Sequence, residues 1–205
     1  MTDAVAAAWL EVLGALVADA AHAVNNVLNS ASVNLSVVAN RLSSPKVAEF
    51  SAEALAGRTA GFAADAANGL DAASELVQSV VALARPLPVP ADPARMVADI
   101  IRVASVGRRH ETAELGVEVR DPIMPPEVAS AVRLAIAAGV RTLVQGERGG
   151  TVRWVAREVA LARPVGAGPE PIVSPRVMGI IADAGVAVRT EADIVTFSIP
   201  DERQH

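Results

Sequence analysis

The chain has 205 residues and a net charge of −5, with acidic and basic residues interspersed. Because no basic stripe is present, we expect no nucleic-acid partner. The absence of cysteine excludes disulfides, thiolate zinc sites and a thiol nucleophile. Hydrophobic residues make up 52% of the chain and aromatic residues only 2%, so the apolar content is mostly alanine and valine, which allows both helices and strands.

The amino-terminal residues carry an acid and no basic segment, so we expect no secretion signal. No uncharged apolar run reaches about 18 residues, so we expect no membrane span. The lack of cysteine also suits a reducing compartment. Together these features predict a soluble, cytoplasmic protein.

Residues 3–42 contain no proline and no turn cluster, and their apolar residues follow a heptad pattern that predicts one long helix. The apolar positions are Leu10, Leu13, Val17, Ala20, Val24, Val27, Ala31 and Val38, with Asn34 as a polar interruption. At 1.5 Å per residue such a helix is about 60 Å long. We therefore expect it to belong to a hairpin or an oligomeric bundle.

A turn at residues 43–45 follows, with Ser44 as an N-cap and Pro45 at the first helical position. A second helix is predicted at residues 46–85. Its seam residues are Leu55, Phe62, Ala66, Gly69, Ala73, Leu76, Val80 and Leu83. The small residues in this seam allow close helix packing, so the two helices are expected to form an αα-hairpin. A symmetric dimer, with the hairpin seam as its interface, would close the hairpin into a four-helix bundle.

Four prolines at positions 86, 88, 90 and 93 predict the end of the second helix and a linker. The elements expected after it are helices at 93–106, 126–145 and 175–184, and strands at 115–120, 151–159, 186–190 and 193–199. The predicted fold class is therefore α+β. A long antiparallel hairpin at residues 1–86 would form the dimeric four-helix bundle, and residues 92–205 would form a small α/β-sandwich domain with helices on one face of its sheet.

A polar stripe with a histidine at its centre interrupts the first helix. With Leu10 at heptad position a, His22 falls at position f and faces away from the seam. The other members of the stripe are Asp19, Asn25, Asn26, Asn29 and Ser36. An exposed histidine is most often a plain surface residue. Asparagine is a poor helix former, however, and such breaks of local preference in mid-helix often mark functional sites.

Residues 22–28, with the sequence HAVNNVL, resemble the H-box of two-component histidine kinases, H-[ED]-x-x-N-x-L. The resemblance implies that His22 accepts a phosphoryl group, for which a neutral imidazole near pH 7 is a suitable nucleophile. It implies that Asn26 orients water or the transferred group. It further implies that Asp19, Asn25 and Asn29 contact a partner. Ala23 replaces the acidic residue of the family motif, which argues against phosphorylation from ATP.

Later segments resemble the family's ATP-binding domain in outline, but its nucleotide ligands are missing. Residues 92–120 resemble its opening helix and strand, 150–154 a central strand and 194–200 the final strand. The helix that should supply a magnesium-binding asparagine, residues 131–140, has none. The D-x-G-x-G aspartate is absent from residues 162–168, and the D-x-G at 183–185 comes too late and is expected to cap a helix. We therefore expect no ATP, cofactor or metal.

The resemblance implies a homodimeric phosphorelay histidine phosphotransferase. It would pass a phosphoryl group between the aspartates of response-regulator receiver domains through His22, without ATP. Three alternatives stay open: a non-catalytic pseudokinase that regulates a response regulator or kinase by binding, a phosphatase that acts on a phospho-receiver through Asn26, and an unrelated helical scaffold. His110 and His205 are assigned no role.

Overall fold

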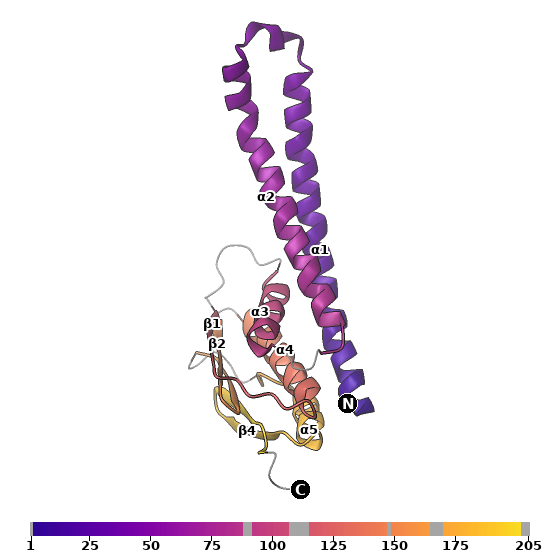
Figure 1. Cartoon of the computed structure of the whole chain (residues 1–205), viewed down its shortest axis with the longest axis vertical. Coiled ribbons are helices and arrows are strands. Elements are labelled where there is room, and N and C mark those ends of the chain that lie inside the picture. Colours follow the sequence, from indigo (N-terminus) through magenta and orange to yellow (C-terminus); the bar gives the residue numbers. More distant parts are fainter. Residues whose placement is uncertain (1, 88–91, 107–114, 147–148, 165–169, 202–205) are drawn as a thin grey trace. The chain divides into compact units, whose positions relative to one another are not determined.

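The computed structural model describes residues 2–87, 92–106, 115–146, 149–164 and 170–201. It confirms an α+β chain, in which a long amino-terminal helical region precedes a small mixed sheet with helices (Figure 1). The chain forms two compact units. Residues 20–78 form the hairpin unit, and residues 1–19 together with 79–205 form the sheet unit.

The helical region consists of α1 (Asp3–Leu42), a short 3-10 helix η1 (Pro45–Glu49) and α2 (Ala52–Ala84). Ser44 caps η1, since its side chain accepts a hydrogen bond from the Lys46 amide at 3.3 Å. The predicted start of the second α-helix at residue 46 was wrong. The α-helix begins only at Ala52, where the Ser51 hydroxyl accepts a hydrogen bond from the Ala54 amide at 3.2 Å.

The predicted seam of the second helix is confirmed, because none of its eight members is exposed. In the hairpin unit a Cβ atom at Gly69 would lie only 3.2 Å from Cγ1 of Val27, so the small residue allows the two helices to approach closely. Near the loop the guanidinium of Arg41 stacks 4.6 Å from the centre of the Phe62 ring and donates a hydrogen bond to the Arg58 carbonyl. Side chains on both helices thus hold the hairpin together.

Near the amino terminus the predicted seam of the first helix is wrong at Leu10 and Val17, whereas Leu13 is buried as predicted. Leu10 is 67% exposed and Val17 36% exposed, whereas Trp9 and Leu16 are buried. The reason is that residues 3–19 pack within the sheet unit. There the Arg133 guanidinium lies 4.0 Å from the centre of the Trp9 ring. Farther along the helix, from Ala20 onward, the seam residues are buried or half-buried as predicted.

The sheet unit contains five strands: β1 (Leu115–Arg120), β2 (Gly150–Val155), β3 (Glu158–Ala162), β4 (Ala187–Glu191) and β5 (Ile194–Ser198). Their order is β1-β2-β3-β5-β4, with β1 and β2 parallel and the other pairs antiparallel. Alternate residues of the central strands are buried: Val152, Trp154, Val159, Leu161, Val195 and Phe197. One face of the sheet therefore forms the core.

Helices α3 (Pro93–Ala104), α4 (Ala129–Gln145) and α5 (Pro175–Asp183) lie on one face of the sheet (Figure 1). Twelve of the 17 residues of α4 are buried, so this helix is covered on nearly all sides. A Cβ atom at Gly139 would lie 2.0 Å from Cδ1 of Leu161 and 3.3 Å from Cγ2 of Val173. A glycine at this position therefore lets α4 pack closely against β3.

The single strand predicted at residues 151–159 was wrong, because this segment folds into the β2–β3 hairpin. Its two-residue turn is Ala156–Arg157, and Ala156 has a φ of 50°. The carbonyl of Ala156 accepts hydrogen bonds from the Trp154 indole at 3.0 Å and the Ile123 amide at 2.8 Å. Turns of this kind normally carry glycine or asparagine at a positive φ, so the sequence contained no turn signal here.

We predict that Ala156→Gly stabilises the sheet unit by about 0.5–1 kcal/mol, because it relieves the left-handed conformation of an alanine. Urea unfolding of the whole chain measures this change. The matched control is Ala160→Gly within β3, where glycine is expected to cost about 0.5–1 kcal/mol. Equal destabilisation by both variants would contradict the strained-turn interpretation.

Candidate functional site

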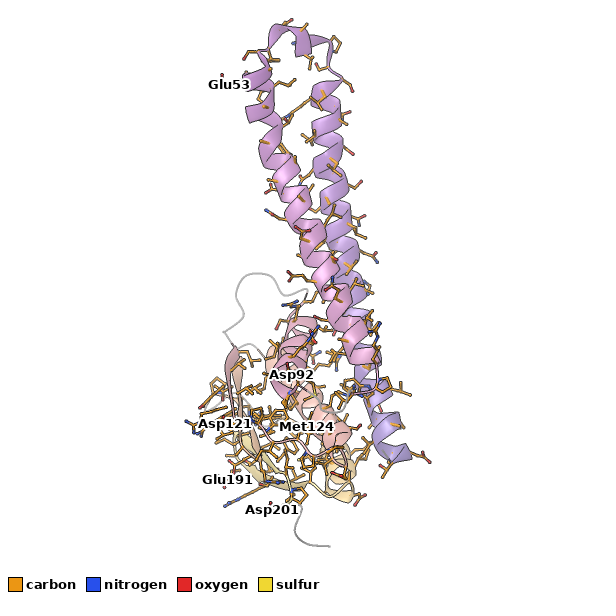
Figure 2. All side chains as sticks on the ribbon, in the orientation of Figure 1. Glu53, Asp92, Asp121, Met124, Glu191 and Asp201 are labelled. Carbon is orange, nitrogen blue, oxygen red and sulfur yellow. The ribbon has the colours of Figure 1, made fainter. Side chains whose placement is uncertain are left out.

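His22 lies in the middle of α1 and its side chain is exposed, as a residue at position f should be. Its ring makes no hydrogen bond or ion pair with any residue that the structure describes. Figure 2 shows side chains projecting along the length of both hairpin helices. Because the side chain of His22 is exposed, its imidazole is accessible to a partner from solvent.

Three asparagines lie on the same face of α1 as His22. Asn25, Asn26 and Asn29 follow it by three, four and seven residues, which is the spacing of one helical face. All three side chains are exposed. The four residues thus form a continuous polar surface of one imidazole and three amides, which we call the His–Asn stripe.

Asp19, the other residue predicted to bind a partner, lies within the sheet unit and is half-buried. Its Oδ2 atom is 3.9 Å from Nε of Arg141 on α4. That distance is too long for a hydrogen bond, and a half-exposed ion pair of this kind contributes at most about 1 kcal/mol. A basic group of a partner would therefore compete with Arg141 for this carboxylate.

Ala23, where the kinase motif carries an acidic residue, has only 8% of its surface exposed. The adjacent His22 is exposed, so the two neighbours face opposite environments. Taking a carboxylate out of water at position 23 would be costly unless it were paired. The packing of α1 thus gives a physical reason for a small apolar residue at this position.

Sequence reasoning missed the role of Arg133, a residue of α4 that is only 3% exposed. Its Nη1 donates hydrogen bonds to the carbonyls of Arg85 at 3.0 Å and Leu83 at 3.5 Å, where α2 ends. Burial lowers the pKa of Arg133 to about 10, so its guanidinium is still charged at neutral pH. The sequence signal for this site is an arginine inside the apolar run 131–140.

Asp183 ends α5, and Gly185 follows with a φ of 89° and an amide that donates to the Ala182 carbonyl at 2.9 Å. This D-x-G segment therefore caps a helix, as predicted. Residues 165–168 of the glycine-containing stretch, the linker residues Pro88 and Pro90, and His110 and His205 lie outside the described residues.

Helix α1 contains an 18-residue stretch long and apolar enough to cross a membrane, judged by length and composition alone. Core helices of soluble proteins and signal sequences meet the same criterion, so the cytoplasmic location stays a prediction. Within the described part of the chain, no cluster of three or more histidine, cysteine or acidic residues could hold a metal ion.

Comparisons with protein-family models, with curated proteins and with solved structures found no match to this chain.

We predict that Trp9→Ala destabilises the protein by about 3–5 kcal/mol, because Trp9 is a large buried side chain stacked under a buried cation. The matched control is Leu10→Ala on the next residue, whose exposure limits its effect to about 0.5 kcal/mol. Chemical denaturation of the two variants distinguishes the observed packing from the heptad register predicted from sequence. A larger loss of stability in Leu10→Ala than in Trp9→Ala would support the heptad register with Leu10 in the seam.

Proposed function

We propose that this chain is a histidine phosphotransferase that passes phosphoryl groups between receiver domains of response regulators. The observation that carries the proposal is the exposed His22 four residues before the exposed Asn26, on the His–Asn stripe of a helical hairpin. The resemblance of residues 22–28 to the H-box supports it. So does the exposure of the imidazole, which in-line attack on a partner's phosphoryl group requires.

In the proposed reaction a nitrogen of the His22 imidazole attacks the phosphorus of an aspartyl phosphate on the first receiver. The N–P bond forms as the bond between phosphorus and the aspartate oxygen breaks, and the aspartate leaves as a carboxylate. The N–H proton on the other nitrogen of the His22 ring then passes to solvent, which the exposure of His22 allows. Transfer to a second receiver reverses these steps, and the metal ion belongs to the receivers.

ATP is not a substrate in this proposal. Ala23 replaces the motif's acidic residue, and it is largely buried. The segment that resembles the magnesium-binding helix lies in α4, where it contributes buried apolar residues and Arg133 rather than an asparagine. The phosphoryl group would therefore enter and leave through protein partners.

A phosphatase is the second candidate, because the exposed Asn26 is in the position that would orient water toward a receiver's aspartyl phosphate. The amide of Asn26 makes no hydrogen bond to any residue that the structure describes, so both its donor and its acceptor groups are available. The two functions use the same docking surface and differ in whether His22 or water attacks the phosphorus.

A homodimer through the hairpin unit is part of the proposal. The heptad seam is used inside the hairpin, so a dimer needs a further apolar surface. A shallow groove of about 420 Å³ supplies one, lined by Leu28, Ala31, Ser32, Leu35, Ser36, Ala39 and Leu70. Leu28, Leu35 and Leu70 are 43%, 49% and 44% exposed, respectively. A second copy of the hairpin would bury these leucines.

We predict that His22→Ala abolishes uptake of label from a radiolabelled phospho-receiver, while the free energy of unfolding changes by no more than about 0.5 kcal/mol. The small effect on stability follows from the exposure of the side chain. The measurement is transfer of label from receivers of the same genome, combined with denaturation of both proteins. Label on the His22→Ala protein would place the phosphoacceptor elsewhere.

Asn26→Ala, with Asn40→Ala as a matched control on the same helix, separates the alternatives. Loss of receiver dephosphorylation with intact binding would favour the phosphatase. A wild-type chain that binds a phospho-receiver but neither takes up label nor dephosphorylates it would favour the pseudokinase.

We predict a dimer at micromolar concentration, and Leu35→Glu is expected to shift it to monomer because it places a charge in the apolar groove. Light scattering after size exclusion measures the mass. Asn40→Glu on the same helix is the control and should leave the dimer intact. A wild-type chain that is monomeric throughout would refute the proposed assembly.

A further inference from the structure

The sheet unit contains a pocket of about 400 Å³ at the end of α2 and the start of α3. Its lining residues are Ala82, Leu83, Arg85, Pro86, Leu87, Asp92, Arg95, Met96, Asp99 and Arg133. The volume falls within the range of small-ligand sites. This pocket, which we call the Arg133 pocket, belongs to none of the steps proposed for His22.

Arg133 is the unusual member of the lining, because it is a buried cation with no counter-ion among the residues that the structure describes. Only 3% of it is exposed, and no carboxylate of the described residues lies within ion-pair distance of its guanidinium. Nε has no hydrogen-bond partner within the described part of the chain. Its Nη1 is satisfied by carbonyl oxygens alone. A buried charge compensated only by dipoles and an aromatic ring is one that an anion would stabilise.

The two carboxylates of the pocket already have partners. Asp92, labelled in Figure 2, accepts a hydrogen bond from the Arg95 amide at 3.0 Å and caps the amino terminus of α3. Asp99 accepts a hydrogen bond from the buried Ser79 hydroxyl at 2.8 Å, and its other oxygen is 4.0 Å from Nε of Arg95. Neither carboxylate therefore neutralises Arg133.

The charge of the lining is consequently positive, since three arginines face two aspartates. Arg95 is well placed to meet a ligand from solvent, because its side chain is 78% exposed. The pocket combines this excess of positive charge with the apolar side chains of Leu83, Leu87 and Met96.

We propose that the Arg133 pocket binds a small organic oxyanion, a carboxylate or phosphate attached to an apolar group. The oxyanion would lie toward Arg133 and Arg95, which supply charge and hydrogen-bond donors. The apolar part would lie against Leu83, Leu87 and Met96. A bound ligand would link the end of α2 to α3 and α4 within the sheet unit.

Isothermal titration calorimetry of the full chain tests the proposal with phenyl phosphate, benzoate and neutral benzyl alcohol. Saturable binding of phenyl phosphate or benzoate with a dissociation constant below about 1 mM is expected, and the stronger of the two identifies the oxyanion. Absence of binding by both anions up to about 10 mM would overturn the proposal. Equal binding of benzyl alcohol would also overturn it, because an apolar cavity would then suffice.

Arg133→Met removes the buried charge at nearly constant volume and should weaken binding of the preferred anion by at least about tenfold. Arg95→Gln at the exposed edge of the pocket should weaken it about threefold, and it keeps the site testable if Arg133→Met does not fold. The control Arg189→Met, on an exposed residue of β4, should bind as the wild type does. Unchanged affinity in the folded pocket variants would refute the assignment.

His22→Ala should bind the anion with wild-type affinity, because the pocket does not include the His–Asn stripe. This variant separates the two hypotheses. If His22→Ala loses phosphoryl transfer but still binds the anion, the Arg133 pocket is supported. If the wild type does not bind the anion, only the Arg133 pocket is refuted and the phosphotransferase proposal is not affected.

Discussion

The contacts of the Arg133 guanidinium join three parts of the chain that are far apart in sequence. The cation lies over the ring of Trp9 near the start of α1, and it donates to the carbonyls of Leu83 and Arg85 at the end of α2. The last carbonyls of a helix have no partner within the helix, and they carry the negative end of its dipole. A buried cation is therefore a suitable cap. Both ends of the helical region belong to the sheet unit, and Arg133 contacts each of them there.

The stability of this arrangement is a balance of opposing terms. Hydrogen bonds from a charged donor contribute about 1.5–3 kcal/mol each, and a desolvated cation–π contact about 2 kcal/mol. Burial of the charge costs several kcal/mol in return. A net contribution close to zero does not by itself explain an arginine here, since an apolar residue of similar volume would fit with similar stability. The proposed role in binding an anion would account for it.

The hairpin unit is held by different contacts, and these leave His22 free. The buried residues of this unit are all alanine except Leu76. The small size of the alanines lets the two helices approach closely, as does the half-buried Gly69 beside Val27. The polar residues of the His–Asn stripe are on the exposed side of α1. The two helices bury their apolar faces against each other. The opposite, polar face of α1 can therefore contact a partner without removing apolar side chains from the core. This is the property that the proposed phosphoryl transfer requires.

The sequence alone determined the features that depend on residues close together in the chain. These are the two long helices with the turn between them, the seam of α2, the exposure of His22 and the cap at Gly185. Their causes are helical periodicity and local backbone preference, which act over a few residues. The similarity of residues 22–28 to a kinase motif is likewise a property of a short segment.

Only the tertiary structure decided the features that depend on contacts between distant residues. In the first turns of α1, Trp9 rather than Leu10 is buried, because that segment packs in the sheet unit. The tertiary structure placed a turn at Ala156 through hydrogen bonds from Trp154 and Ile123. It also brought Arg133 to the end of α2, about 50 residues away in the chain. No periodicity could reveal these choices, since each is set by packing between elements rather than by the order of residues within one.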